Sequence, residues 1–230
     1  MPGEIVLYTI PGSHACRATI LMLEHKGMSW RERVMPPGIQ TATMQLRGFP
    51  GRTVPAIRSD GERVQTNREI ARFLDRVRPE PPLVPAEREA EVEEAEAFID
   101  GMLQPLARRL TLAAGRRDLS RLANHADSGR LGVILAPSRW RRRFAIWGAH
   151  RYFGIHGRVE SLDLAALPGV LDHVDSLVSA GTLNGAELNA ADFQAAPCLA
   201  LIGYRLDVRD IVASRPSWAL VERLLPEPAG

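Results

Sequence analysis

Two short segments near the N-terminus constrain the fold more than any other feature of the chain. Residues 7–17 read LYTIPGSHACR, an apolar strand followed by a tight turn and the start of a helix. Residues 53–57 read TVPAI, a short strand that carries a proline, Pro55. Proline cannot donate to a neighbouring strand, so it marks an edge, a turn or a cis bond. Together the segments predict one corner of an α/β unit, where a helix N-terminus can stabilise an anion such as a thiolate.

The following elements extend this unit in the order β-α-β, an irregular or helical link, and β-β-α. Apolar spacing and turn residues predict four strands at 4–9, 29–34, 54–57 and 63–65, and helices at 14–25 and 69–78. Gly27 is the expected end of the first helix, and Asp60-Gly61 the expected hairpin turn. We expect Asn67 to cap the second helix.

A proline-rich segment, residues 78–85, divides the chain because neither a helix nor a central strand accepts its sequence RPEPPLVP. We predict a first domain over 1–78, a linker over 79–85 and an all-helical domain over 86–230. The expected helices are 86–115, kinked or split by Pro105, then 119–153 with a break near 136–137, 168–179, 192–204 and a short one beginning near Pro216. Asn189 and Asp192 have the spacing of a helix-capping pair, which is a structural motif.

The segments SHACRATILMLEHKG, GRTVPAI and TNREIARFL, in this order of elements, resemble the glutathione S-transferase superfamily across essentially the whole chain. The resemblance is to a serine-type, bacterial member. It implies an α/β thioredoxin-like N-terminal domain followed by an all-α C-terminal domain, and a homodimer. The implied activity is transfer of glutathione to a small hydrophobic electrophile.

Ser13 occupies the position at which serine-type members carry the hydroxyl that stabilises the thiolate. A hydroxyl donor beside a helix N-terminus suits this task, because the thiol form is a poor nucleophile near neutral pH. The alternative is that Ser13 only caps the helix, and the sequence leaves both open. Tyr8 lies one residue from the position of the catalytic tyrosine in other members. We therefore expect it to face the opposite side of the sheet and to pack.

The resemblance also assigns the cofactor-binding residues. Val54 before a cis Pro55 would bind the cysteinyl backbone of glutathione through its main chain. Thr66-Asn67 replaces the Glu-Ser or Gln-Ser pair that usually holds the γ-glutamyl carboxylate, and Arg52 can reach a second carboxylate. Because the pair is altered, another low-molecular-weight thiol such as mycothiol is an alternative cofactor.

Two neighbours of Ser13 have alternative interpretations. His14 can donate to an anionic sulfur or act as a base, or can simply be solvated at the helix start. Cys16 stands at the second position of a C-x-x-C motif whose first cysteine is replaced by Ser13, so a dithiol mechanism has lost its usual nucleophile. We expect Cys16 to be a half-buried structural residue, with a redox role as the competing hypothesis.

Composition limits the possible partners. The net charge of +2 weakens the case for nucleic acid, even though residues 138–144 are rich in arginine. No apolar run reaches the length of a membrane span, and two cysteines favour a reducing, cytoplasmic location. The histidines and cysteines show no metal-ligand spacing. The electrophile site is expected near residues 102–110 and 140–153. The remaining alternatives are a thiol-dependent isomerase, reductase or lyase, and a non-catalytic binding or scaffold protein of the same fold.

Overall fold

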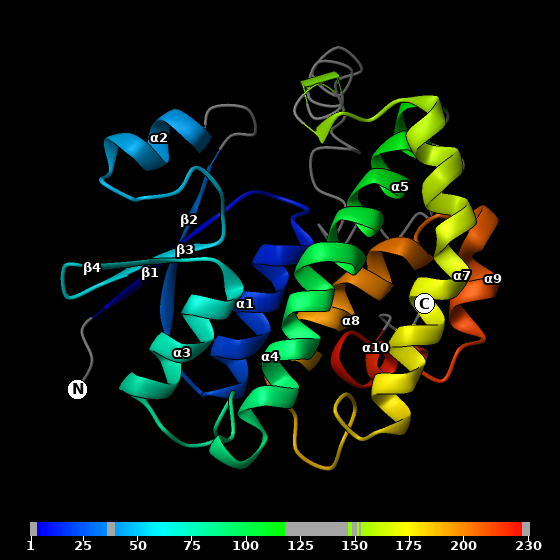
Figure 1. The fold of residues 1–230 in the computed structure, drawn as a ribbon. Helices are drawn as coiled ribbons and strands as arrows, with labels where there is room; N and C mark the ends of the chain where they lie inside the picture. The colour runs from blue at the N-terminus through cyan, green and yellow to red at the C-terminus, as the bar shows by residue number, and fades with distance from the viewer. Residues whose placement is uncertain (1–3, 36–39, 118–146, 149–150, 152, 227–230) are drawn as a thin grey trace.

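The computed structural model describes residues 4–35, 40–117, 147–148, 151 and 153–226. An N-terminal α/β layer lies beside a larger helical part (Figure 1). Four strands form a sheet in the order β2-β1-β3-β4: β1 (Ile5–Thr9), β2 (Trp30–Val34), β3 (Ala56–Ser59) and β4 (Glu62–Gln65). The β1–β2 pair is parallel, while β1–β3 and β3–β4 are antiparallel. This mixed sheet confirms the predicted β-α-β and β-β-α order.

Helices cover both faces of this sheet. They are α1 (His14–His25), α2 (Gln40–Leu46) and α3 (Asn67–Val77). Ile5 and Leu7 of β1 join the main core with residues of α1 and α3. Val6 and Tyr8 point to the other face and form a smaller cluster that includes Met44 of α2. The arrangement is thioredoxin-like, as predicted, and the prediction that Tyr8 packs is confirmed.

The start of α3 differs from the sequence prediction. Thr66, and not Asn67, is the N-cap, and its hydroxyl oxygen accepts a hydrogen bond from the Glu69 N–H at 3.3 Å. The helix therefore begins at Asn67, two residues earlier than expected. Both Thr and Asn can cap a helix, so the pattern alone could not choose between them.

The only lysine of the chain, Lys26, lies buried where α1 and α3 end. Its ammonium forms an ion pair with Asp75 and donates to the carbonyl oxygens of Arg78, at 2.6 Å, and Pro79, at 3.2 Å. The Asp75 carboxylate also accepts from the backbone N–H of Leu83, at 2.9 Å, and of the following residue. This Lys26–Asp75 clamp holds the proline-rich segment against the α/β layer.

The helical part begins with an interrupted helix. Its pieces are η1 (Ala86–Arg88), α4 (Glu89–Phe98), the π-helical turn η2 (Ile99–Leu103) and α5 (Gln104–Arg117). The interruption falls just before Pro105, which has no N–H to donate to the preceding turn. The predicted split of this long helix is thus confirmed.

The later helices correct the sequence prediction in two places. They are α7 (Gly157–Ser179), α8 (Ala190–Gly203), α9 (Leu206–Ala213) and α10 (Trp218–Leu224). Helix α7 starts at Gly157 and continues through Pro168, whereas we expected a start at Pro168. Helix α9 was not predicted. Most of the helical stretch expected over 119–153 lies outside the described residues.

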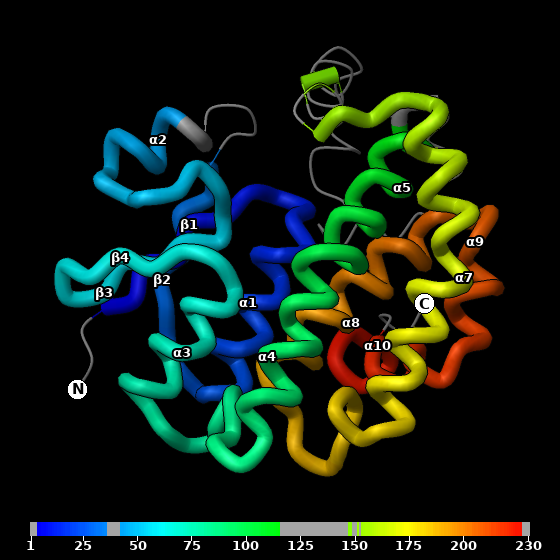
Figure 2. Tube along the Cα trace, viewed as in Figure 1, coloured from blue at the N-terminus to red at the C-terminus, as the bar shows by residue number. Residues whose placement is uncertain are grey.

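Helix α8 is the centre of the helical part, and all of its residues are buried. It packs against α1, α4, α5, α9 and α10 (Figures 1 and 2). Its N-terminus has the predicted capping box: Asn189 accepts from the Ala191 N–H at 2.9 Å, and Asp192 accepts from the Asn189 N–H at 2.9 Å. The Ala190 N–H donates to the Leu83 carbonyl at 2.7 Å, which joins α8 to the proline-rich segment.

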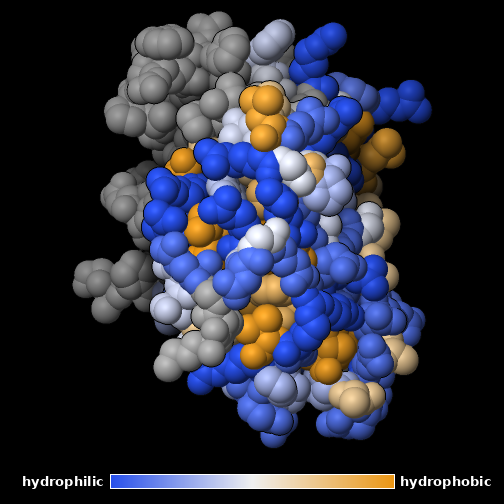
Figure 3. All heavy atoms as spheres, turned by 90° about the vertical axis from the view of Figure 1, so that its left-hand side faces the viewer, coloured by the Kyte–Doolittle hydropathy of each residue, from blue (hydrophilic) through white to orange (hydrophobic). Residues whose placement is uncertain are grey.

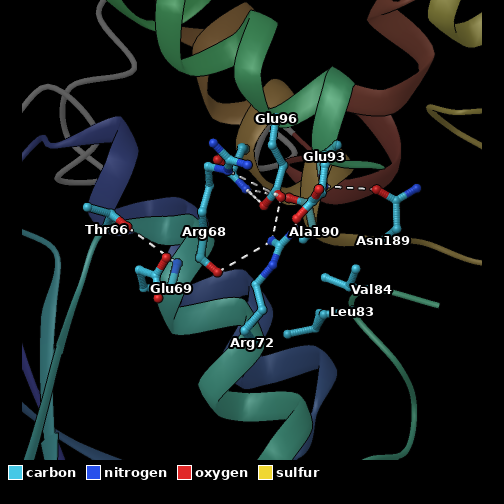
Figure 4. A network of polar contacts seen from close by, with 12 residues as sticks. Thr66, Arg68, Glu69, Arg72, Leu83, Val84, Glu93, Glu96, Asn189 and Ala190 are labelled. Atoms are coloured by element: carbon cyan, nitrogen blue, oxygen red, sulfur yellow. Dashed lines mark hydrogen bonds and ion pairs between the residues drawn. The ribbon is translucent and has the colours of Figure 1, made fainter. Parts of the chain in front are cut away.

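A buried acid, Glu96 of α4, joins α3, α4 and α8 (Figure 4). It pairs with Arg72 and lies 3.7 Å from the Nε atom of Arg68, both on α3. Its second oxygen accepts from Nε2 of Gln194, on α8, at 2.6 Å. Burial raises the pKa of Glu96, and the two arginines oppose that effect. Through this network the first turns of α3 are fixed against α4 and α8.

The outer face of the α/β layer is mostly hydrophilic, with separate hydrophobic patches (Figure 3). The most exposed large apolar side chain of the described residues is Leu46, at 88% exposure. None of the helices that the structure describes is long and apolar enough to cross a membrane.

Substitution at the Lys26–Asp75 clamp should destabilise the protein strongly. Asp75→Ala leaves a buried ammonium without its counter-ion, so we expect a loss of about 3–5 kcal/mol in the free energy of unfolding. Glu62→Ala is the matched control, because Glu62 pairs with Arg76 at the surface and should cost less than about 1 kcal/mol. Urea denaturation of the three proteins measures both values, and equal losses would contradict the role given to the clamp.

Candidate functional site

The sheet topology brings three segments to one end of the α/β layer. β1 ends at Thr9, and the chain turns there into the start of α1. β3 begins at Ala56, which is paired with Tyr8 of β1. β4 ends at Gln65, which is paired with Ala56 and precedes Thr66. Three segments therefore lie at the same end of the sheet: the N-terminus of α1, the residues before β3 and the N-terminus of α3.

Ser13 is the N-cap of α1. Its hydroxyl oxygen accepts from the Cys16 N–H at 3.3 Å, and its own N–H donates to the Ile10 carbonyl. A hydroxyl that accepts through a lone pair still has its proton to donate. Capping and donation to an anion at the helix N-terminus are therefore compatible, and the two interpretations left open by the sequence do not exclude each other.

His14, the first residue of α1, is buried, so the alternative that it is simply solvated is wrong. Its Nε2 atom has no hydrogen-bond partner among the residues that the structure describes. Burial and the positive charge of Arg108 lower the pKa of His14 to about 3, so the imidazole is neutral near pH 7. It can donate or accept a hydrogen bond there, but it adds no positive charge to the helix N-terminus.

Cys16 lies inside the first turn of α1 and is buried more deeply than the expected half-burial. Burial raises the pKa of its thiol to about 11, and the neighbouring Ser13 and Ile10 offset only part of this effect. Cys198 of α8 is also buried, and burial raises the pKa of its thiol as well. Both thiols stay protonated near neutral pH, so neither is a ready nucleophile.

The loop before β3 contains Arg52, Val54 and Pro55. The Val54–Pro55 peptide bond is cis, as the resemblance implies. Pro55 is buried, Val54 is half-buried and Arg52 is exposed. The side chain of Gln65, at the end of β4, binds this loop through two hydrogen bonds, one to Gly51 and one to Thr53. We did not predict this contact from the sequence.

The N-terminus of α3 contains Thr66 and Asn67. Thr66 has φ 70° and ψ 148°, which is unusual for a β-branched residue and typical of strain held at functional sites. Asn67 is buried, and its Oδ1 atom accepts from the hydroxyl of Thr19, on α1, at 2.7 Å. This bond joins the N-terminus of α3 to the middle of α1 and leaves the Nδ2 group of Asn67 as a donor.

The region expected to hold the electrophile is only partly described. In the segment 102–110, Met102 is half-exposed, and the guanidinium of Arg108 lies 4.5 Å from the ring centroid of Phe153. Asp100 lies near Arg68 and Arg108, whose charges oppose the rise in its pKa that burial causes. Residues 140–146 lie outside the described residues. Asp100 and Arg108 had no signal in the sequence, because isolated charges in a helical pattern predict solvated positions.

Among the described residues, no group of three or more histidine, cysteine, aspartate or glutamate side chains is arranged to bind a metal ion. The candidate site is therefore built from a hydroxyl, an imidazole, main-chain groups, amides and an exposed guanidinium. These groups can bind the carboxylates and peptide groups of a small polar molecule and stabilise an anion at the start of α1.

Comparison with known proteins gives a consistent result. Residues 7–82 match the family described as glutathione S-transferase, N-terminal domain. Among solved structures, glutathione transferase GSTFuA2 from Phanerochaete chrysosporium is 17% identical with a TM-score of 0.69, and the alignment covers 99% of each chain. A glutathione S-transferase from Rhodospirillum rubrum is 24% identical with a TM-score of 0.55, and covers 99% of this chain and 94% of its own.

Two further structures extend the comparison. The glutathione S-transferase CsGST83044 of Ceriporiopsis subvermispora, solved in complex with glutathione, is 20% identical with a TM-score of 0.58, over 99% of this chain and 95% of its own. The β-etherase LigF from Sphingobium is 14% identical with a TM-score of 0.62, over 96% of this chain and 99% of its own. No curated protein sequence matches the chain. Residues 7–82 therefore match the glutathione S-transferase N-terminal domain, and the described residues share the fold of the glutathione transferases.

Proposed function

We propose that the protein is a glutathione transferase that adds the thiolate of glutathione to a small hydrophobic electrophile. The observation that carries the proposal is that the α1 and α3 N-termini lie at the same end of the sheet, with Asn67 at the start of α3 bonded to Thr19 in the middle of α1. Helix N-termini favour anions, and glutathione presents both a sulfur that must ionise and two carboxylates. The glutathione-bound neighbour CsGST83044 supports this choice of thiol.

In this proposal Ser13 is the catalytic residue. Its hydroxyl donates to the sulfur, and the partial positive charge of the α1 N-terminus favours the same anion. The buried, neutral His14 lies next to it and contributes a hydrogen bond without a charge. Ser13 therefore lowers the pKa of the bound thiol, which increases the fraction of the nucleophilic thiolate near neutral pH.

The remaining residues bind the peptide part of the cofactor. The main chain of Val54, beside Pro55, binds the cysteinyl backbone. Thr66 and Asn67 bind the γ-glutamyl end through the N-terminus of α3, and Arg52 binds the carboxylate at the other end. Mycothiol is the alternative cofactor, because Thr66-Asn67 replaces the pair that is usual in the family.

A second candidate function is a thiol-dependent isomerase, reductase or lyase, which would use the same thiol site for a different reaction. The structural neighbour LigF is a β-etherase, which supports a reaction other than simple transfer for a protein of this fold. A non-catalytic binding or scaffold protein is the third candidate, favoured by the altered Thr66-Asn67 pair. A redox role for Cys16 is disfavoured by the burial of its thiol.

We further propose that the protein is a cytoplasmic homodimer. The support for a dimer is the exposure of large apolar side chains on the α/β layer, Leu46 at 88% and Val34 at 59%. A partner subunit that covered these side chains would remove their apolar surface from water.

Three variants of Ser13 separate thiolate stabilisation from helix capping. Ser13→Ala removes both, Ser13→Asp keeps a capping acceptor but has no proton to donate when ionised, and Ser13→Thr keeps both. We expect activity with a model aryl halide to fall about 10²-fold in the Ala and Asp variants and little in the Thr variant. The ultraviolet absorbance of bound thiolate should show the same order. Activity of Ser13→Ala within twofold of wild type would show that Ser13 is only a cap.

The buried thiols should be inert in the folded protein. Because the pKa of Cys16 lies at about 11, we expect little modification by a disulfide reagent between pH 7 and 8, and a rate that rises as the pH approaches that pKa. In denaturant, where both cysteines are exposed, the disulfide reagent should modify both of them rapidly, and this serves as the control. Cys16→Ser should retain thiol-transfer activity. Rapid modification of one thiol at pH 7 with loss of activity would revive the redox hypothesis.

A further inference from the structure

The side chain of Gln65 bridges two main-chain groups of the loop before β3. Its Oε1 atom accepts from the Gly51 N–H at 2.5 Å, and its Nε2 atom donates to the Thr53 carbonyl at 2.9 Å. Gln65 is buried, and its backbone is held by pairing with Ala56 across the β3–β4 ladder. The primary amide thus acts on the loop as a neighbouring strand would, with one donor and one acceptor.

Gly51 permits this close contact because it has no side chain. A Cβ atom at Gly51 would lie 2.7 Å from Oε1 of Gln65 and 3.2 Å from its Cδ atom. Both distances are shorter than an ordinary van der Waals contact, so any larger residue would push the loop and the amide apart. The close approach depends on glycine at one end and on a buried amide at the other.

The two hydrogen bonds lie on either side of Arg52. They hold the residue before it and the residue after it, while the Arg52 side chain itself is exposed. An exposed arginine on an unrestrained loop samples many positions, and ordering it on binding has an entropic cost. With both neighbours held, less of that cost remains when the guanidinium meets an anion.

Gln65 also connects this loop to the other half of the candidate site. The residue that follows it is Thr66, the strained N-cap of α3, and Asn67 comes next. One buried side chain therefore sets the position of the loop relative to the N-terminus of α3. A thiol that spans the two segments must match the separation that Gln65 fixes.

We propose that Gln65 is a positioning residue that holds Arg52 in place to bind a carboxylate, so that the site selects thiols ending in a free carboxylate. This inference rests on the proposed function, since it assumes that a peptide-like thiol binds at this end of the sheet. Arg52 makes the contact with the ligand, and Gln65 acts only through the loop.

The test compares glutathione with its glycine monoethyl ester, in which the terminal carboxylate is blocked. Calorimetric titration of the full chain gives both dissociation constants for wild type, Gln65→Ala, Arg52→Ala, the double variant and Gln45→Ala. Gln45 is an exposed glutamine on α2 and provides the matched control. Exchange of the Gly51 amide proton, measured in wild type and Gln65→Ala, reports directly on the bond to Gln65.

We expect wild type and Gln45→Ala to prefer glutathione by at least about tenfold, which corresponds to about 1.4 kcal/mol. Gln65→Ala and Arg52→Ala should each reduce this preference to about twofold or less, with little change for the ester. The double variant should be no worse than either single variant, because the two residues act through one contact. The Gly51 amide should exchange faster in Gln65→Ala.

Three results would overturn the inference: a tenfold preference that survives in Gln65→Ala, additive losses in the double variant, or a wild type that binds both thiols equally. In each of these cases the proposed function still stands, because a thiol binds. Failure of the proposed function itself would be a wild type that binds neither thiol. Should Gln65→Ala not fold, Gly51→Ala disturbs the same contact from the loop side and must also lose the preference.

Discussion

Helix α1 is held between the sheet and the buried helix α8, and this packing fixes the position of its N-terminus in the candidate site. Apolar residues of α1 share one core with β1, α3 and α8, so the sheet and the helical part are stabilised together. The N-terminus of α1 lies at the end of the sheet where β1 finishes, and its partial positive charge is available there to an anion. The Lys26–Asp75 clamp secures the other end of the same helix.

Polar contacts then set the finer geometry of the site. Asn67 is tied to α1 through Thr19, and Glu96 holds α3 against α4 and α8 from further along the helix. Gln65 holds the loop that precedes β3. Each of these groups is buried, so a lost partner would be costly, and the positions of the ligand-facing groups are correspondingly well defined. The chemistry proposed for Ser13 depends on the positions of these neighbouring groups more than on any unusual property of the serine itself.

Sequence patterns predicted the strands, the first helix and the capping box at Asn189 and Asp192, because these depend on local spacing. They did not predict that Thr66 rather than Asn67 caps α3, since both residues can do so. They also missed the continuation of α7 through Pro168, because a proline pattern by itself predicts a helix start or break. The burial of His14 and the bridge from Gln65 to Gly51 depend on residues far apart in the chain. Only the three-dimensional structure brings those partners together.

The central claim is that a low-molecular-weight thiol binds between the N-termini of α1 and α3. Thermal and urea unfolding of the full chain with increasing glutathione, and separately with mycothiol, tests it most directly. The account predicts saturable stabilisation by glutathione, of about 2.7 kcal/mol at a hundred times the dissociation constant. Stabilisation by mycothiol alone would keep the site and change its cofactor. No stabilisation by either thiol would contradict the claim.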